Sequence, residues 1–163
     1  MAIPLPPAHP LAQLLGELVG RDVTARTAAK PVPADPRQLA VAAFDDEQKA
    51  LRAVAYCDLP VAASLGAALI LIPPGRVDES VKAKALDQQL TDNVYEVFNV
   101  MSSLFPRHGG PRLILRSVHH NGDVPDDVKA VLDRAAKLKP SERSDLDVEV
   151  AGYQSGRMVL IAA

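Results

Sequence analysis

The stretch TDNVYEVFNVMSSLF, Thr91 to Phe105, predicts a single amphipathic helix. Its large apolar side chains recur at the i, i+3, i+4, i+7 spacing of a helix side that packs on a core. They are Val94, Val97, Phe98, Met101, Leu104 and Phe105, preceded by Leu90. At about 100° per residue, polar residues fall within roughly 60° of one another on the opposite side: Asp92, Glu96, Asn99 and Ser103. The sequence therefore predicts a helix with one buried side and one narrow polar stripe.

The composition of this polar stripe is unusual, because it holds no Lys or Arg and includes an asparagine. Asparagine is only a modest helix former, since its amide competes for backbone hydrogen bonds. Helix propensity therefore does not account for Asn99. Two interpretations stay open: a solvated helix side, which is what most such stripes are, or a functional site that needs this amide.

The overall composition is that of one globular domain. A chain of 163 residues can bury a sizeable core but is short for two ordinary domains. With 48% hydrophobic and 23% charged residues, the chain is not disordered. A net charge of −2, without clustered Lys and Arg, argues against nucleic acid as a partner. We predict one domain over residues 1–163, with residues 1–9 as a proline-rich lead.

The sequence carries features of a cytoplasmic protein. Cys57 is the only cysteine, and its apolar strand context predicts a buried thiol in a reducing compartment. The first 20 residues lack a basic segment and are interrupted by prolines, unlike a signal peptide. The longest apolar run, residues 59–72, is shorter than the roughly 20 residues of a spanning helix. We expect this run to lie in the core, and expect no membrane partner.

The order of expected elements predicts an α+β fold with mostly antiparallel pairing. We expect helices at residues 9–20, 60–72, 77–86, 91–105 and 123–138, and strands at residues 38–44, 51–57, 111–120 and within a hairpin over 144–163. Residues 28–38, rich in proline, are expected to be a loop that would tolerate a short edge strand. In the last strand, Met158 to Ile161 are expected to be buried, and the segment RMVLIAA at 157–163 is a candidate sheet edge that would need cover.

This layout, with NVYEVFNV on its longest helix, resembles the CheC/CheX/FliY family of chemotaxis phosphatases, and in particular the single-site CheX form. The shared signature is E-x-x-N on a central helix, here Glu96 and Asn99, with Asp92 at an acidic or hydroxyl position that often precedes it. The resemblance covers nearly the whole chain from His9 onwards. It implies a mostly antiparallel sheet with two long helices packed on one face.

The resemblance also implies a function. Members of this family remove phosphate from the aspartyl phosphate of CheY-like receiver domains. Carried over by residue, Glu96 would contact a lysine of the partner and Asn99 would orient the attacking water. Asp92 and Ser103, at the two ends of the stripe, are expected to contact the partner beside them. No cofactor is expected on this chain, since Mg²⁺ belongs to the receiver, and a homodimer is plausible by family likeness.

Departures from the family pattern keep other functions open. Only one E-x-x-N is visible, and the helix at 60–72 has no Glu or Asn. The helix expected from Pro125 onwards replaces an expected strand. A non-catalytic interaction or dimerisation module of the same fold is therefore the alternative to an enzyme. A small-molecule binding domain also stays open, although no residue cluster in the sequence points to one.

The sequence does not predict a metal site or a hydrolase triad. His119 and His120 lie near several aspartates, but adjacent strand residues face opposite ways and do not easily share an ion. We expect a solvated pair of histidines at a loop. Ser117, His119 and Asp123 are the residue types of a triad, but no nucleophile elbow accompanies them.

Overall fold

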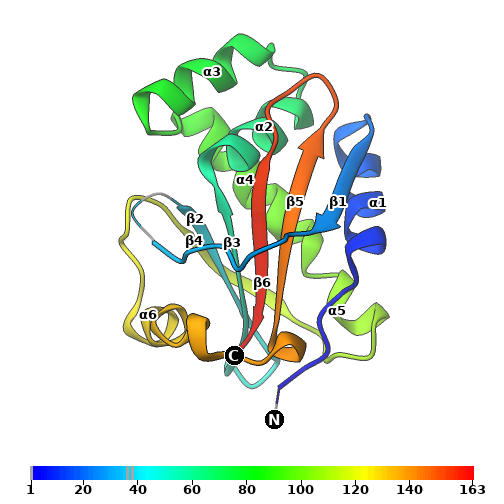
Figure 1. Cartoon of the computed structure of the whole chain (residues 1–163), viewed down its shortest axis with the longest axis vertical. Helices are drawn as coiled ribbons and strands as arrows, with labels where there is room; N and C mark the ends of the chain where they lie inside the picture. The colour runs from blue at the N-terminus through cyan, green and yellow to red at the C-terminus, as the bar shows by residue number, and fades with distance from the viewer. Residues whose placement is uncertain (1, 36, 38) are drawn as a thin grey trace.

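The computed structural model describes residues 2–35, 37 and 39–163 (Figure 1). Its elements are α1 (Ala8–Val19), β1 (Val23–Thr27), β2 (Leu39–Asp45), β3 (Leu51–Asp58), α2 (Leu59–Leu69), α3 (Pro74–Ala83), α4 (Gln88–Met101), α5 (Leu104–Arg107), β4 (Ile114–His119), α6 (Asp126–Asp133), the 3₁₀ helices η2 (Ala135–Lys137) and η3 (Pro140–Glu142), β5 (Arg143–Val150) and β6 (Gly156–Ala162). The predicted α+β fold is confirmed. Met1 of the predicted lead and Gln38 of the predicted strand lie outside the described residues.

Six strands of the described chain form one sheet, in the order β1-β5-β6-β3-β2-β4. Every neighbouring pair is antiparallel, and the hairpins β2–β3 and β5–β6 are those expected from the sequence. The prediction that residues 157–163 form an edge strand is wrong, because β6 pairs with both β3 and β5. Its apolar run, Met158 to Ala162, is buried on both sides, as befits a central strand. β1 and β4 are the edges.

Both faces of the sheet are covered. Alternate strand residues point to opposite faces, so Ala53 and Ala55 of β3 pack with α1, α2 and α4, whereas Val54 and Tyr56 pack with α6. Figure 1 shows α6 apart from the other three helices. The predicted pair of long helices on one face is confirmed, and α1 joins them. Cys57 is buried on this face, as predicted, and burial raises the pKa of its thiol.

The start of α2 is set by local chemistry. The Asp58 carboxylate accepts a hydrogen bond from the Val61 amide at 3.2 Å, and Pro60 lies in the first turn, where its missing N–H is not needed. The helix is buried from Val61 to Ala68, so this part of the apolar run lies in the core, as expected. The helix ends at Leu69 rather than at residue 72, and Ile70 and Leu71 at the end of the run are exposed. No helix within the described residues is both long and apolar enough to cross a membrane.

The central helix α4 is displaced from its predicted range of 91–105. It begins at Gln88, where the Asp87 carboxylate accepts from the Leu90 amide at 2.9 Å, and it ends at Met101. The end has a physical cause, because Pro106 has no N–H for the Ser102 carbonyl and its ring would clash with that group. The chain turns and then forms the short helix α5, whose Leu104 and Phe105 remain in the core.

Other boundaries also differ from the prediction. The strand β1 was not predicted, since its sequence VTART is short and mostly polar, and it forms an edge by pairing with β5. Helix α3 begins at Pro74 rather than at residue 77, because proline suits a first helical turn. Helix α6 ends at Asp133, and a 3₁₀ turn replaces the rest of the predicted helix. The predicted lead already enters α1 at Ala8.

Candidate functional site on helix α4

The two sides of α4 differ as the sequence predicted. Its apolar side is buried in the core through Leu90, Val94, Val97, Phe98 and Met101. On the opposite side Asp92, Glu96 and Asn99 are all exposed. Within the described residues, these three side chains of the polar stripe therefore form an exposed surface of α4.

Glu96 and Asn99 are neighbours on this surface, since residues three apart on a helix lie side by side. Among the described residues, neither side chain takes part in a hydrogen bond or an ion pair. An acidic group and an amide thus stand next to each other, both directed to the outside. Such a pair can offer a carboxylate to a cation and an amide to a water molecule.

The position of Asn99 differs from the expectation of a mid-helix residue. Because α4 ends at Met101, Asn99 lies in the last turn. Its backbone carbonyl accepts a hydrogen bond of 2.6 Å from the Ser102 hydroxyl, which helps to end the helix there. An asparagine costs less in a terminal turn than in a helix interior. Helix propensity therefore explains part, but not all, of the choice of Asn99.

The ends of the predicted stripe behave differently. The Asp92 carboxylate is exposed and accepts from the Gln88 side-chain amide at 2.7 Å, one turn earlier on the same helix. Ser103 lies beyond the end of α4, so its predicted place on the helical stripe is wrong. Its hydroxyl is half-buried and donates to the Val100 carbonyl at 2.8 Å.

Tyr95 adds an aromatic side chain to this surface. It is 44% exposed and stands one turn before Asn99, next to Glu96. Sequence reasoning gave it no role, although a large aromatic residue on the solvent side of an amphipathic helix is an available signal. Tyrosine is enriched at protein interfaces, because it combines apolar area with a polar tip.

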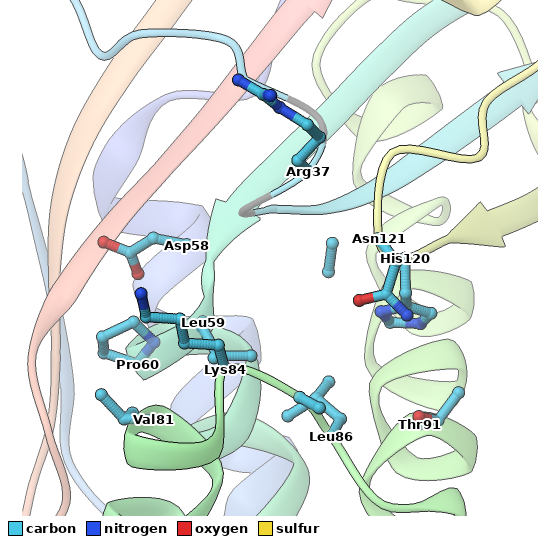
Figure 2. A pocket seen from close by; sticks show the side chains of 12 residues that line it. Arg37, Asp58, Leu59, Pro60, Val81, Lys84, Leu86, Thr91, His120 and Asn121 are labelled. Carbon is cyan, nitrogen blue, oxygen red and sulfur yellow. The ribbon is translucent and has the colours of Figure 1, made fainter.

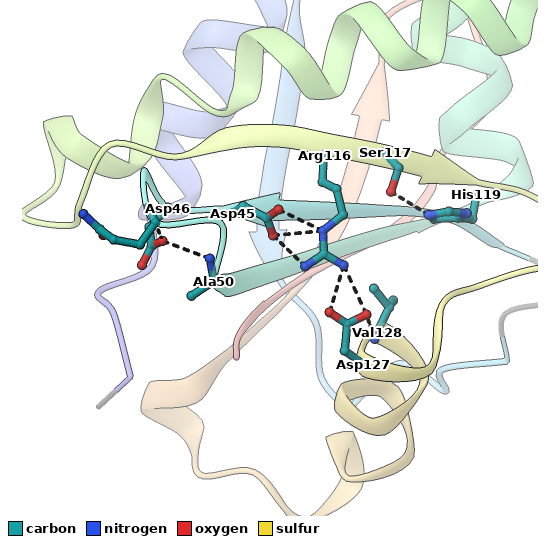
Figure 3. Close-up of polar contacts among 9 residues, drawn as sticks. Asp45, Asp46, Ala50, Arg116, Ser117, His119, Asp127 and Val128 are labelled. Atoms are coloured by element: carbon teal, nitrogen blue, oxygen red, sulfur yellow. Dashed lines mark hydrogen bonds and ion pairs between the residues drawn. The ribbon is translucent and has the colours of Figure 1, made fainter.

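Several polar residues on the face of the sheet that α6 covers contact one another. Arg116 binds Asp45 of β2 and Asp127 of α6, with nitrogen to oxygen distances of 2.7 and 2.8 Å, and so ties α6 to the sheet (Figure 3). His119 shares a hydrogen bond of 2.6 Å with Ser117. Within the described ranges, no group of three or more His, Cys, Asp or Glu residues gathers at one point.

The prediction that His119 and His120 are solvated is wrong, because both are half-buried. His119 belongs to β4 and lies on the face that α6 covers, opposite Val41 of β2. His120 follows the strand and lines a separate pocket. Burial, together with the neighbouring His119, lowers the pKa of His120.

The chain has a CheC/CheX/FliY-like fold. Solved structures similar to it include the FliM–SpeE complex from H. pylori, at 8% identity and a TM-score of 0.63, covering 95% of this chain and 80% of that one. FliY from Thermotoga maritima matches at 13% identity and a TM-score of 0.54, over 94% and 82% of the two chains.

A third similar structure is the CheX–CheY–BeF3–Mg²⁺ complex from Borrelia burgdorferi, at 9% identity and a TM-score of 0.51, covering 93% and 92% of the two chains. At these identities the likeness shows the fold, which confirms the resemblance in fold expected from the sequence. No protein-family model and no curated protein matches the chain.

Proposed function

We propose that this chain is a phosphatase that acts on the aspartyl phosphate of a CheY-like receiver domain. The observation that carries the proposal is the exposure of Glu96 and Asn99 side by side on α4 in a chain with this fold. The CheX structure that resembles the chain is a complex with CheY, which supports a receiver domain as the partner.

In the proposed reaction this chain forms no covalent bond with the phosphoryl group. Water attacks the phosphorus atom, the bond from phosphorus to the aspartyl oxygen breaks, and the products are inorganic phosphate and a free carboxylate. Such a reaction depends mainly on holding the water in line and on stabilising charge. The Asn99 amide would orient the water, because it offers both a donor and an acceptor. Mg²⁺ on the receiver would neutralise the phosphoryl group.

Glu96 is proposed to hold the partner in place. Its carboxylate would pair with a lysine beside the phosphorylated aspartate, which fixes the distance between that phosphate and Asn99. Asp92 would extend the contact by one turn. The Ser103 hydroxyl is engaged with Val100, so we assign Ser103 a packing contact at the rim of the docked partner.

A second candidate is a non-catalytic interaction module. It is favoured by the FliM–SpeE complex, whose TM-score of 0.63 exceeds the 0.51 of the CheX complex. In this case the same surface of α4 would bind a protein without promoting hydrolysis. Asn99 would then matter for affinity only, and not for rate.

Phosphate release distinguishes the two candidates. A panel of receiver domains is charged with a small phosphodonor and Mg²⁺, and the decay of the phosphorylated form is followed with wild type, Asn99→Ala and Glu96→Gln. Glu79→Gln is the matched control, since Glu79 is exposed on α3. We expect wild type and the control to accelerate decay equally. Binding of a receiver without any acceleration would reject the phosphatase and support the module.

A further inference from the structure

Ile70 and Leu71 form an apolar knob at the connection between α2 and α3. Ile70 is 47% exposed and Leu71 is 75% exposed. Single exposed apolar side chains are common on proteins, but these two large aliphatic side chains are adjacent and form one patch. Ile72, which follows them, is buried, and its carbonyl accepts a hydrogen bond from the Tyr153 hydroxyl. The knob is therefore attached to a backbone that is held in place.

The backbone of Leu71 is also unfavourable for this residue type. Its φ of 61° is in the left-handed region, which glycine and asparagine adopt more easily than leucine. The Leu71 amide donates to the Ala68 carbonyl at 3.3 Å, and the Ile72 amide donates to the Ala67 carbonyl at 2.9 Å. This pair of hydrogen bonds is the Schellman motif, in which glycine is the usual residue at the position of Leu71. Neither burial nor backbone preference explains this leucine, whereas a contact outside the chain would.

A pocket of about 540 Å³ lies beside the first turn of α2 (Figure 2). Leu59 and Pro60 from this turn form one part of its wall, and Val81 and Leu86 form another. In Figure 2 Leu59 and His120 stand on opposite sides of the open space. Its volume and its largely apolar wall suit apolar side chains. No residue of the polar stripe on α4 lines the pocket, so it is separate from the proposed catalytic site.

The knob and the pocket lie at opposite ends of the pair of helices α2 and α3. The knob connects the end of α2 to the start of α3, whereas the pocket is lined by the start of α2 and by residues at and after the end of α3. The 11 residues of α2 separate the two features by about 16 Å. The knob therefore does not reach the pocket of its own chain, but it can enter the pocket of a second copy.

The charges along α3 favour such a contact between two copies. Asp78 and Glu79 are exposed acids on the knob side of the helix, and Arg76 is neutralised by its ion pair with the aspartate that caps α4. Lys82 and Lys84, on the pocket side, are exposed and have no ion pair within the part of the chain that the structure describes. Packing of knob against pocket brings the acids of one copy toward the lysines of the next. Packing of knob against knob about a two-fold axis would instead bring the acids of both copies together.

We propose that copies of this chain associate head to tail, with Ile70 and Leu71 of one copy seated in the pocket between Leu59 and Leu86 of the next. The contact joins two different surfaces, so a free knob remains at one end of the assembly and a free pocket at the other, and the association is open-ended. Two side chains bury little area, which places this contact in the class of weak and reversible interfaces.

Sedimentation velocity between about 10 μM and 1 mM protein measures this association. We expect the weight-average mass of wild type to rise with protein concentration and to fall when salt is added, because salt screens the charges. Leu71→Asn removes the knob and should stay monomeric over the same range, while asparagine suits the left-handed backbone and keeps the fold. Ile114→Thr is the matched control, since Ile114 is 51% exposed on β4 and threonine suits a strand. This control should associate as wild type does.

A second variant disables the pocket. Ala85 lines the pocket and is exposed, so Ala85→Glu puts a carboxylate where the apolar knob would sit and should also be monomeric. Ala83→Glu is the matched control, because Ala83 is exposed two residues earlier and does not line the pocket. In a mixture, Leu71→Asn supplies an intact pocket and Ala85→Glu supplies an intact knob. The two monomeric variants should therefore form a complex of two copies and no larger assembly.

Wild type that stays strictly monomeric at about 1 mM overturns the proposal, and so does association of Leu71→Asn that equals that of wild type. A contact between two knobs would leave Ala85→Glu associated and the mixture without a complex, which also overturns it. Should Ala85→Glu fail to fold, dilute labelled wild type is mixed with an excess of Leu71→Asn. A labelled complex of two copies is then expected, because the wild-type knob can enter an intact pocket, and a labelled monomer overturns the proposal.

Discussion

The Asn93 side-chain amide donates a hydrogen bond of 2.8 Å to the backbone carbonyl of Gly66, which joins α4 directly to α2. Gly66 allows this close approach, since a methyl group there would lie 3.1 Å from the Leu90 carbonyl oxygen and 3.3 Å from Val94. The contact determines how α4 is rotated on the core. The direction in which Glu96 and Asn99 face therefore depends on a glycine in a neighbouring helix.

Gly66→Ala is expected to lower the free energy of unfolding by about 1–3 kcal/mol, because the added methyl group overpacks the α2–α4 contact. Thermal denaturation followed by circular dichroism measures the effect. Gly75→Ala is the control, since a methyl group at Gly75 meets nothing within 4 Å in the first turn of α3. That control should be neutral or slightly stabilising. Equal melting temperatures for the two variants would contradict the tight contact.

A buried ion pair holds the other face of the sheet. The Arg143 and Asp145 side chains are only 8% and 12% exposed, and Arg143 also donates to the Ala135 carbonyl at 2.6 Å. Asp145→Ala leaves the guanidinium buried without its partner, so we expect a loss of about 3–5 kcal/mol in the free energy of unfolding. Urea denaturation measures it.

Asp147→Ala is the matched comparison for this pair. Asp147 lies two residues further along β5 and pairs with Arg157 at 3.4 Å, but both side chains are about half exposed, at 52% and 49%. Exposed pairs contribute about 0–1 kcal/mol. A loss for Asp147→Ala as large as that for Asp145→Ala would show that burial does not govern the strength of these pairs.

The spacing of apolar residues along the sequence predicted single helices and one hairpin correctly. The buried side of α4 follows from the helical period of Val94, Val97 and Phe98, and the β2–β3 hairpin from two apolar runs joined by a charged turn. The order of the strands depends on pairing between distant segments. β6 is central because it pairs with β3, which lies far from it in the sequence, as well as with β5. The local signal for this position was its continuous apolar run.

Of the candidate site, the sequence predicted the features that depend on local helix geometry and missed those that depend on distant segments. The exposure of Glu96 and Asn99 follows from their angle on the helix relative to the apolar side. The prediction misplaced Ser103 because it did not take account of Pro106, which cannot donate a hydrogen bond to the Ser102 carbonyl four residues earlier and so ends α4 before Ser103. The pocket at His120 was not predicted, since it brings together residues from β2, α2, α4 and the loop after β4.

Acid is expected to weaken the attachment of α6. The hydrogen bond from Arg116 is the main cause that holds the pKa of Asp127 below the usual value of an aspartate. A carboxylate with a lowered pKa in the folded state stabilises the protein above its unfolded pKa, and this contribution is lost as the pH falls through the folded pKa. The difference in melting temperature between wild type and Asp127→Asn should therefore be largest near neutral pH and shrink below about pH 4.

Asp133→Asn serves as the control for this pH profile. Asp133 lies on the same helix, but its ion pair with Lys129 is 3.6 Å long and both side chains are more than 60% exposed, at 67% and 63%. We expect the melting temperature of Asp133→Asn to stay close to that of wild type at every pH, because an exposed ion pair contributes little to stability. A gap between wild type and Asp127→Asn that stays constant from pH 7 to about pH 3 would contradict the lowered pKa.

Asn99→Ala should affect stability and rate in opposite directions. Asn99 is exposed, and its side chain has no hydrogen bond within the described residues, while alanine is the better helix former. We therefore expect the melting temperature to stay the same or rise slightly. On the proposed phosphatase function, the acceleration of receiver dephosphorylation should fall by about 100-fold, because a misplaced water costs roughly this factor. A fall in rate accompanied by unfolding would point to a structural role, whereas a stable variant with unchanged rate would remove Asn99 from the reaction. The third outcome, a stable variant that binds the receiver and no longer dephosphorylates it, is the one expected of a residue that holds the attacking water.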